Sequence, residues 1–220
     1  MVAGNLIRFV AVVVAAYLLG AIPFALIIGK RFYKIDVREH GSGNLGATNV
    51  FRTLGIKAAV ATLLLDAAKG AAAVGFAYLV FTGRSDLARE WGMIAATIAA
   101  VAGHSYSPYI RFTGGKGVAT AAGALLVLTP YPWPILLGLF ILVVLLSRMV
   151  SLGSVVDAVA YPLLCLVFYA GDWPIIGFSF GIAALVIWRH RANIVRIAHG
   201  EESRISLSGR GSAARRKDAI

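Results

Sequence analysis

Long runs of apolar residues, interrupted by short polar stretches, constrain this chain more than any other feature of its sequence. Of its 220 residues, 59% are hydrophobic and 14% are charged, and the mean hydropathy is +0.81. Soluble domains contain about 45 to 50% apolar and about 25% charged residues. Because the runs match the roughly 20 residues that a helix needs to cross a bilayer core, we predict one integral membrane domain.

Seven apolar segments are separated by polar, proline or glycine breaks. They lie at residues 6–29, 56–82, 92–109, 117–130, 134–147, 153–170 and 174–189. The pattern predicts an all-α, polytopic protein with about seven transmembrane helices. The third, fourth and fifth segments are short for a hydrocarbon core about 30 Å thick. We therefore expect polar loops to dip inward there, around a wet cavity.

The basic residues are divided unequally between the two sides of such a protein. One orientation places seventeen of the 21 lysines and arginines on the cytoplasmic side and three, Arg8, Arg84 and Arg89, outside, while Lys69 lies within a segment. The positive-inside rule then puts the N-terminus outside and the C-terminus in the cytoplasm. The net charge of +11 therefore requires no nucleic acid. We expect a membrane domain over 1–202 and a basic, disordered tail over 203–220 that can touch anionic lipids.

Three short patterns imitate soluble nucleotide-binding or hydrolase motifs. GSGNLGA fits a dinucleotide fingerprint, TGGKG resembles part of a phosphate-binding P-loop, and GFSFG has the letters of a nucleophile elbow. Each motif needs a strand that leads into a soluble helix. No such alternation of strands and helices is predicted here, so all three interpretations fail on context.

Three loops rich in small residues nevertheless share one side of the predicted topology. GSGNLGATNVFR, FTGGKGVAT and SLGS precede the second, fourth and sixth segments, whose N-termini all face the cytoplasm. Helix N-termini carry unpaired N–H groups and a partial positive charge, and glycine lets an anion approach the backbone closely. Arg52 and Lys116 add full charges. The pattern predicts a site for a phosphorylated metabolite.

The same stretches carry a family resemblance. SGNLGATNVFR, GHSYSPYIRFTGGKGVAT, SLGS and WRHRANIVRIAHGEE, in this order and spacing, closely resemble the bacterial acyl-phosphate-dependent glycerol-3-phosphate acyltransferases over residues 17–202. The resemblance implies transfer of a fatty acyl group from acyl phosphate to the sn-1 hydroxyl of glycerol 3-phosphate, giving lysophosphatidate and phosphate at the bacterial inner membrane. Its implied partners are these two substrates, membrane lipid and an upstream enzyme that makes acyl phosphate. One departure is Leu45, where the family pattern has proline.

The resemblance also implies a set of binding positions. They are Ser42, Asn44, Thr48, Asn49 and Arg52 in the first loop, His104, Gly114, Gly115, Lys116 and Gly117 in the second, Ser151 and Ser154 in the third, and His190, Asn193 and Glu201 in the last motif.

Acyl phosphate is already activated, so positioning and charge stabilisation can carry most of the catalysis. We expect Lys116 and Arg52 to clamp phosphate, with Ser42 and the serines at 151 and 154 donating hydrogen bonds. The proton acceptor stays open between His190, His104 and a substrate phosphate oxygen. Since the resemblance favours the phosphate, His190 is assigned to binding first. No metal or other cofactor is expected, because the four histidines are scattered along the sequence.

Three ionisable residues within the apolar segments have two readings each. Asp66 and Lys69, one turn apart, form either a structural pair or part of the site, and Asp157 makes either a structural polar contact or orients Ser154 or a basic neighbour.

A transporter of a phosphorylated solute is the main alternative function, since transporters also use helix N-termini near a cavity. It predicts polar sites at the bilayer midplane and two matching halves, whereas here the motifs gather at one surface.

Overall fold

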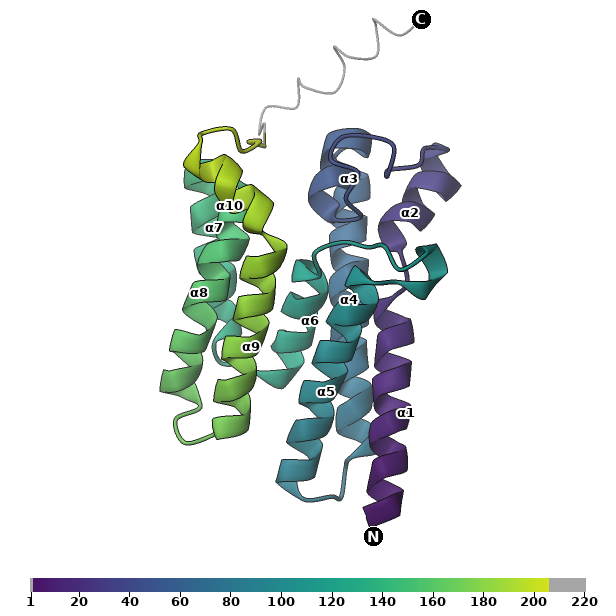
Figure 1. Ribbon diagram of the computed structural model, residues 1–220, viewed down its shortest axis with the longest axis vertical. Coiled ribbons are helices and arrows are strands. Elements are labelled where there is room, and N and C mark those ends of the chain that lie inside the picture. The colour runs from purple at the N-terminus through teal and green to yellow at the C-terminus, as the bar shows by residue number, and fades with distance from the viewer. Residues whose placement is uncertain (1, 206–220) are drawn as a thin grey trace, which may run out of the picture.

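The computed structural model describes residues 2–205, and these are helical with no β-strand among them (Figure 1). The α-helices are α1 (Val2–Gly20), α2 (Phe24–Ile28), α3 (Ala47–Leu54), α4 (Ile56–Val80), α5 (Asp86–Ser105), α6 (Val118–Leu128), α7 (Trp133–Ser147), α8 (Val150–Phe168), α9 (Trp173–Arg189) and α10 (Arg191–Ala198). A π-helical turn covers Gly29–Tyr33 and a 3-10 turn covers Pro108–Ile110. The predicted all-α class is confirmed.

Every predicted apolar segment contains a helix, but several edges differ. The first segment breaks after Gly20, because Pro23 has no N–H to continue the helix. The third begins earlier, at Asp86, where the Ser85 hydroxyl accepts a hydrogen bond from the Ala88 N–H at 3.3 Å and caps a polar first turn. Helix α3 was not predicted, since it lies in the glycine-rich stretch that we interpreted as a loop.

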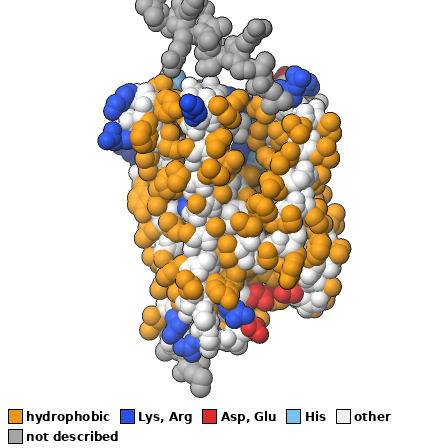
Figure 2. Space-filling view, turned by 180° about the vertical axis from the view of Figure 1, so that it is seen from behind, with side chains coloured by type: hydrophobic (Ala, Val, Ile, Leu, Met, Phe, Trp, Pro, Cys, Tyr) orange, Lys and Arg blue, Asp and Glu red, His pale blue; other side chains and the backbone are white. Residues whose placement is uncertain are grey.

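Within residues 2–205, three helical stretches are long and apolar enough to cross a bilayer: Gly4–Tyr33, Ile56–Val80 and Val150–Phe168. The pair α9 and α10, bent by 61°, would make a fourth, whereas α6 and α7 are apolar but shorter. Figure 2 shows hydrophobic side chains covering the middle of one face, with lysines and arginines gathered toward its two ends. An apolar surface of this extent is suited to lipid.

Glycines allow the helices on one side of the molecule to pack closely. A Cβ atom at Gly123 of α6 would lie 1.8 Å from the Ala67 carbonyl oxygen of α4, and one at Gly103 of α5 would lie 2.1 Å from the Tyr17 carbonyl oxygen of α1. No side chain fits these contacts. Figure 1 shows α1, α4 and α5 together, α7, α8 and α9 together, and α6 between the two groups.

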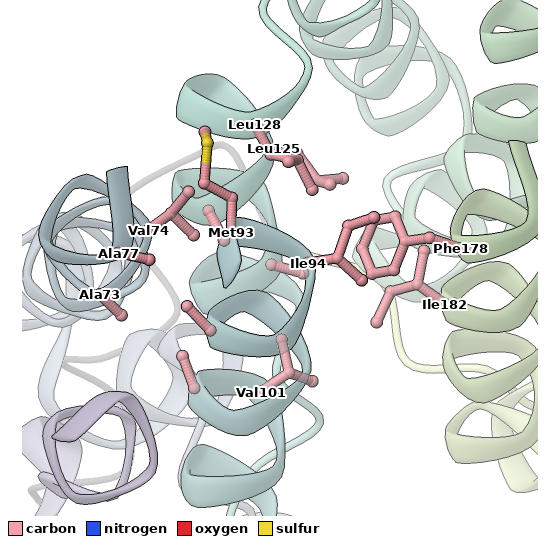
Figure 3. Close-up of a cluster of buried hydrophobic side chains, with 14 of the residues drawn as sticks. Ala73, Val74, Ala77, Met93, Ile94, Val101, Leu125, Leu128, Phe178 and Ile182 are labelled. Atoms are coloured by element: carbon pink, nitrogen blue, oxygen red, sulfur yellow. The ribbon is translucent and has the colours of Figure 1, made fainter. Parts of the chain in front are cut away.

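A cluster of buried hydrophobic side chains joins the two groups of helices. Met93 and Ile94 of α5 lie in one cluster with Leu125 of α6 and with Phe178 and Ile182 of α9 (Figure 3). The cluster fixes the two groups against each other away from the end that carries α3 and α10. At that end, where the polar motifs lie, the helices are connected by the loops that form the site.

Candidate active site

The first motif loop is held in shape by Asn49, whose side chain is 2% exposed. Its Nδ2 donates to the carbonyl oxygens of Val37 at 2.9 Å and His40 at 3.2 Å, and its Oδ1 accepts a hydrogen bond from the Ser42 N–H at 2.9 Å. Gly41 and its neighbour at 43 have φ values of +62° and +68°, which favour glycine. Asn49 therefore orders the loop that leads into α3, a role that the sequence pattern did not distinguish from ligand binding.

The second motif loop packs its glycines against His104. A Cβ atom at Gly115 would lie 2.1 Å from His104 Nε2, and one at Gly114 would lie 2.1 Å from the His104 carbonyl oxygen. Arg189 Nη2 donates to the Gly115 carbonyl oxygen at 2.6 Å. These contacts fix the backbone directly before Lys116. Gly114 and Gly115 thus position the lysine, and neither lies in the wall of the cavity.

Lys116 begins a chain of buried polar contacts that ends at a carboxylate. Its Nζ donates to Asn193 Oδ1. Glu202 Oε1 accepts hydrogen bonds from Asn193 Nδ2 and from Ser151 Oγ, both at 2.7 Å, and Glu202 Oε2 accepts one from Arg196 Nε at 2.8 Å. The second loop, the start of α8 and the end of the chain are thereby joined in one network.

The acidic member of this network is Glu202, and the prediction named its neighbour. Glu201 is exposed and does not line the cavity, whereas Glu202 is 9% exposed and does. The chain after α10 turns back onto the helices, where the Ile205 N–H donates to the Arg148 carbonyl oxygen at 2.8 Å. This return directs Glu202 inward. It also places the first residues of the predicted tail on the folded unit, while residues 206–220 lie outside the described part.

A cavity of about 700 Å³ is lined by residues of α3, α4, α5, α6, α7, α8, α9 and α10. Twelve of the fifteen predicted positions line it: Ser42, Asn44, Thr48, Asn49, Arg52, His104, Lys116, Gly117, Ser151, Ser154, His190 and Asn193. The three that do not are Gly114, Gly115 and Glu201. Arg189 and Arg196 also line it and were missed as site residues, although both stand in the last quoted motif.

The cavity has a polar, cationic mouth and an apolar interior. Arg52, Lys116, Arg189 and Arg196 lie in the wall that also holds the motif loops. The remaining walls on α6, α7 and α9 are hydrophobic. They are formed by Ala121, Ala122, Leu125, Trp133, Leu136, Leu137, Phe140, Ile182, Ala183 and Val186. One compartment therefore offers an anion site beside space for a hydrocarbon chain.

The charges in the mouth perturb one another. Burial, with smaller contributions from Arg196, Arg189 and Arg52, lowers the pKa of Lys116 to about 8, while Glu202 opposes the shift. Burial alone would raise the pKa of Glu202, but the hydrogen bonds from Ser151, Asn193 and Arg196 outweigh it and hold the pKa below its ordinary value. The mouth thus holds an ionised carboxylate within a surplus of positive charge.

His190 is neutral at physiological pH. Burial and the nearby Lys116 ammonium lower its pKa to about 4, and its Nδ1 lies 2.8 Å from the Val186 carbonyl oxygen. In the neutral ring this contact fixes the proton on Nδ1, because a carbonyl oxygen can only accept. Nε2 is then a hydrogen-bond acceptor at the boundary between α9 and α10.

The pair of Asp66 and Lys69 is confirmed, and it also reaches the cavity. Lys69 Nζ lies 2.7 Å from Asp66 Oδ1 and donates to the Ile22 carbonyl oxygen at 2.8 Å, and both side chains are 2% exposed. Asp66 lines the cavity, with its Oδ1 3.6 Å from His104 Nδ1. Over residues 2–205, no group of three or more His, Cys, Asp or Glu side chains is arranged to hold a metal ion.

Comparison with known proteins identifies the family to which the chain belongs. The sequence model of the family described as glycerol-3-phosphate acyltransferase matches residues 10–200. The chain belongs to the glycerol-3-phosphate acyltransferase family. The glycerol-3-phosphate acyltransferase of Listeria monocytogenes serovar 1/2a is 43% identical over 199 residues, which are 90% of this chain and 98% of that protein. That of Exiguobacterium sibiricum is 44% identical over 204 residues, 92% and 96% of the two chains.

Two solved structures of the acyltransferase PlsY, described as an integral membrane protein, share the fold. Its glycerol 3-phosphate form superposes with a TM-score of 0.81 at 37% identity, over 90% of this chain and 96% of that one. Its lysophosphatidic acid form gives a TM-score of 0.78 at 36% identity, over 90% and 95%. As a member of this family the protein is an integral membrane acyltransferase, and the transporter alternative is set aside.

Proposed function

We propose that this acyltransferase moves a fatty acyl group from acyl phosphate to the sn-1 hydroxyl of glycerol 3-phosphate, giving lysophosphatidate and inorganic phosphate. The observation that carries the proposal is a single cavity with a cationic, glycine-lined mouth and a hydrocarbon interior. Such a compartment fits a donor whose leaving group is a phosphate and whose other end is a lipid tail. The two PlsY forms, described with glycerol 3-phosphate and with lysophosphatidic acid, agree with the acceptor and the product.

The two substrate phosphates would share the mouth. Arg52 and Lys116 neutralise their mutual repulsion, and the N–H groups at the start of α3 and the hydroxyl of Ser42 donate hydrogen bonds. The hydroxyls of Ser151 and Ser154 donate to Glu202 Oε1 and to the Val150 carbonyl oxygen, so they would have to turn away from these partners to donate to a phosphate. Four or five charge-assisted hydrogen bonds, each contributing about 1.5 to 3 kcal/mol, are enough to hold a small phosphorylated molecule. The acyl chain would extend between α6, α7 and α9, where the cavity wall is apolar.

The reaction needs little covalent help from the protein. The sn-1 oxygen attacks the acyl carbonyl carbon, the carbon–oxygen bond to phosphate breaks with its electron pair leaving on the phosphate, and the hydroxyl proton is transferred to a phosphate oxygen. A histidine with a pKa of about 4 is a weak base at neutral pH. We therefore assign His190 to orienting the hydroxyl, by accepting its hydrogen bond at Nε2, and assign proton acceptance to the substrate phosphate.

The proposed setting is the bacterial inner membrane, with seven spans, an external N-terminus and the mouth facing the cytoplasm. The basic side chains near the motif loops and the positive-inside rule support this orientation. α6 and α7 are shorter than a full span, so the loops beside them would cover the remaining thickness of the bilayer. Figure 1 shows α6 beginning well below the level of α3. An enzyme that makes acyl phosphate would supply the donor.

The test is an assay of purified protein in lipid nanodiscs with labelled glycerol 3-phosphate. Acyl phosphate, acyl-CoA and acyl-carrier protein are compared as donors, with EDTA present throughout. We expect lysophosphatidate from acyl phosphate alone. Product formed only from acyl-CoA or only from acyl-carrier protein would overturn the donor assignment, and activity lost in EDTA would overturn the metal-independent mechanism.

A further inference from the structure

Asp157 is an acid in the cavity wall to which the reaction described above gives no role. It lies on α8, is half-buried, and faces the same compartment as Ser151 and Ser154. Its Oδ1 is buried and has no hydrogen-bond partner, and no salt bridge to it occurs among residues 2–205. The Ser154 hydroxyl donates to the Val150 carbonyl oxygen at 3.0 Å, so the structure shows no hydrogen bond by which Asp157 would orient this serine.

A carboxyl in this position is expensive to keep. An acid within a membrane helix costs about 2.5 to 3.5 kcal/mol on insertion scales unless it is paired or hydrated. The α6 and α9 residues that line the cavity with it include Ala121, Ala122, Ala183 and Val186, and none of these can hydrogen-bond through its side chain. An unsatisfied polar group that persists in a site points to a ligand that satisfies it.

The depth of Asp157 indicates which part of the ligand it meets. It lies six residues beyond Ser151 on α8, which is about 9 Å further from the mouth at 1.5 Å per residue. Arg52 and Lys116 hold the mouth, and Tyr161, one turn beyond Asp157, lies on the apolar side. Asp157 therefore lies where the phosphate site ends and the hydrocarbon space begins, which is where the glycerol part of the acceptor substrate would lie.

We infer that Asp157 is the acceptor-specificity residue, whose carboxyl accepts a hydrogen bond from the sn-2 hydroxyl of glycerol 3-phosphate. The inference rests on the proposed function. With the phosphate held at the mouth and the sn-1 hydroxyl oriented by His190, the sn-2 hydroxyl is the remaining donor on the acceptor substrate. A carboxyl oxygen accepts from a hydroxyl but has nothing to accept from a ketone or a methylene. The site would thus discriminate against dihydroxyacetone phosphate and against an acceptor that lacks the sn-2 hydroxyl.

The test is a thermodynamic cycle in which Asp157 and the sn-2 hydroxyl of the substrate are removed separately and together. kcat/KM is measured with glycerol 3-phosphate and with 3-hydroxypropyl phosphate, which lacks the sn-2 hydroxyl, for the wild type and for Asp157→Ala. We expect the wild type to prefer glycerol 3-phosphate about 10- to 100-fold, the cost of leaving a buried acceptor without its hydrogen-bond partner. In Asp157→Ala this ratio should fall to about 1 through loss of activity toward glycerol 3-phosphate. Asp86→Asn, which removes an exposed acid of α5, should keep the wild-type ratio.

The outcomes separate the two proposals. Equal losses with both substrates, or an unchanged ratio, would overturn the role of Asp157 while leaving the acyltransferase intact. Absence of any lysophosphatidate from acyl phosphate in the wild type would instead overturn the proposed function, and this inference with it. If Asp157→Ala does not fold, Asp157→Asn, which keeps the shape and one neutral acceptor, should give an intermediate ratio, and a wild-type ratio there would be decisive against the inference.

Discussion

The pKa of Lys116 makes the pH profile of the enzyme a direct test of the phosphate clamp. Burial and three arginines lower this pKa to about 8, so the free enzyme loses the charge of Lys116 within an accessible pH range. The pH dependence of kcat/KM reports groups of the free enzyme. The second ionisation of the phosphate monoester lies near pH 6, so the substrate is already a dianion above neutral pH and does not mask the lysine.

The expected size of the effect comes from the same value. With a pKa of about 8, roughly nine-tenths of the Lys116 side chains are charged at pH 7 and roughly one-tenth at pH 9. If only the charged form binds phosphate productively, kcat/KM falls about tenfold between these two pH values. An ordinary lysine, with a pKa near 10.4, would leave kcat/KM almost unchanged over the same interval.

The assay measures initial rates of lysophosphatidate formation from pH 6.5 to 10, with a blank without enzyme to correct for hydrolysis of acyl phosphate. Lys116→Arg is the matched variant, because guanidinium stays charged throughout this range. Its absolute rate should be lower, since arginine has a different shape, but its alkaline decline should disappear. A wild-type profile that is flat to pH 10, or an arginine variant with the same decline, would refute the assignment of Lys116.

Three further predictions concern the supports of the site. Glu202→Gln should lower kcat/KM about 10- to 100-fold, because it puts an amide beside Arg196 in place of a charged acceptor, whereas Glu201→Gln should stay near wild type in the same assay. Gly123→Ala should lower the melting temperature measured in detergent, at a cost of about 1 to 3 kcal/mol, while Gly75→Ala, with nothing within 4 Å of its added methyl group, should not. Asn49→Ala should speed proteolysis of the 37–46 loop and reduce activity with unchanged helical content by circular dichroism; an unchanged cleavage rate would contradict its role.

The fold was largely predictable because hydropathy along the sequence shows which segments can face lipid. A helix that faces lipid must be apolar along its length, so the seven segments could be located from the sequence. The errors fall where polar residues form helix. α3 begins in a glycine-rich stretch, and α5 begins at Asp86 with charged residues in its first turns. In both places capping and packing determine the helix, and hydropathy carries no information about either.

The site was predictable as a set of loops but not as a set of contacts. Helix direction alternates from span to span, so the sequence could place three motifs on one side, and the structure brings them to one cavity. The third was predicted as a loop but is helical, because SLGS forms the first turns of α8. Which of two adjacent acids turns inward depends on how the chain returns after α10, and this is fixed by contacts such as Ile205 to Arg148. Likewise, only the packed structure shows that Gly115 supports His104 and thereby positions Lys116.

The two readings of Asp66 and Lys69 turn out not to exclude each other. Lys69 donates to the Ile22 carbonyl oxygen, which lies in the break between α1 and α2 directly before Pro23 and also accepts from the Phe24 N–H at 3.1 Å, so the lysine adds a second donor to this irregular backbone. Its partner Asp66 stands in the cavity wall 3.6 Å from His104. A single buried pair therefore ties the break in the first helix to the histidine that supports the second motif loop. Removing both charges from water costs free energy that their mutual attraction alone often does not offset. The cost is understandable if the same pair stabilises the helix break and contributes to the electrostatic potential of the site.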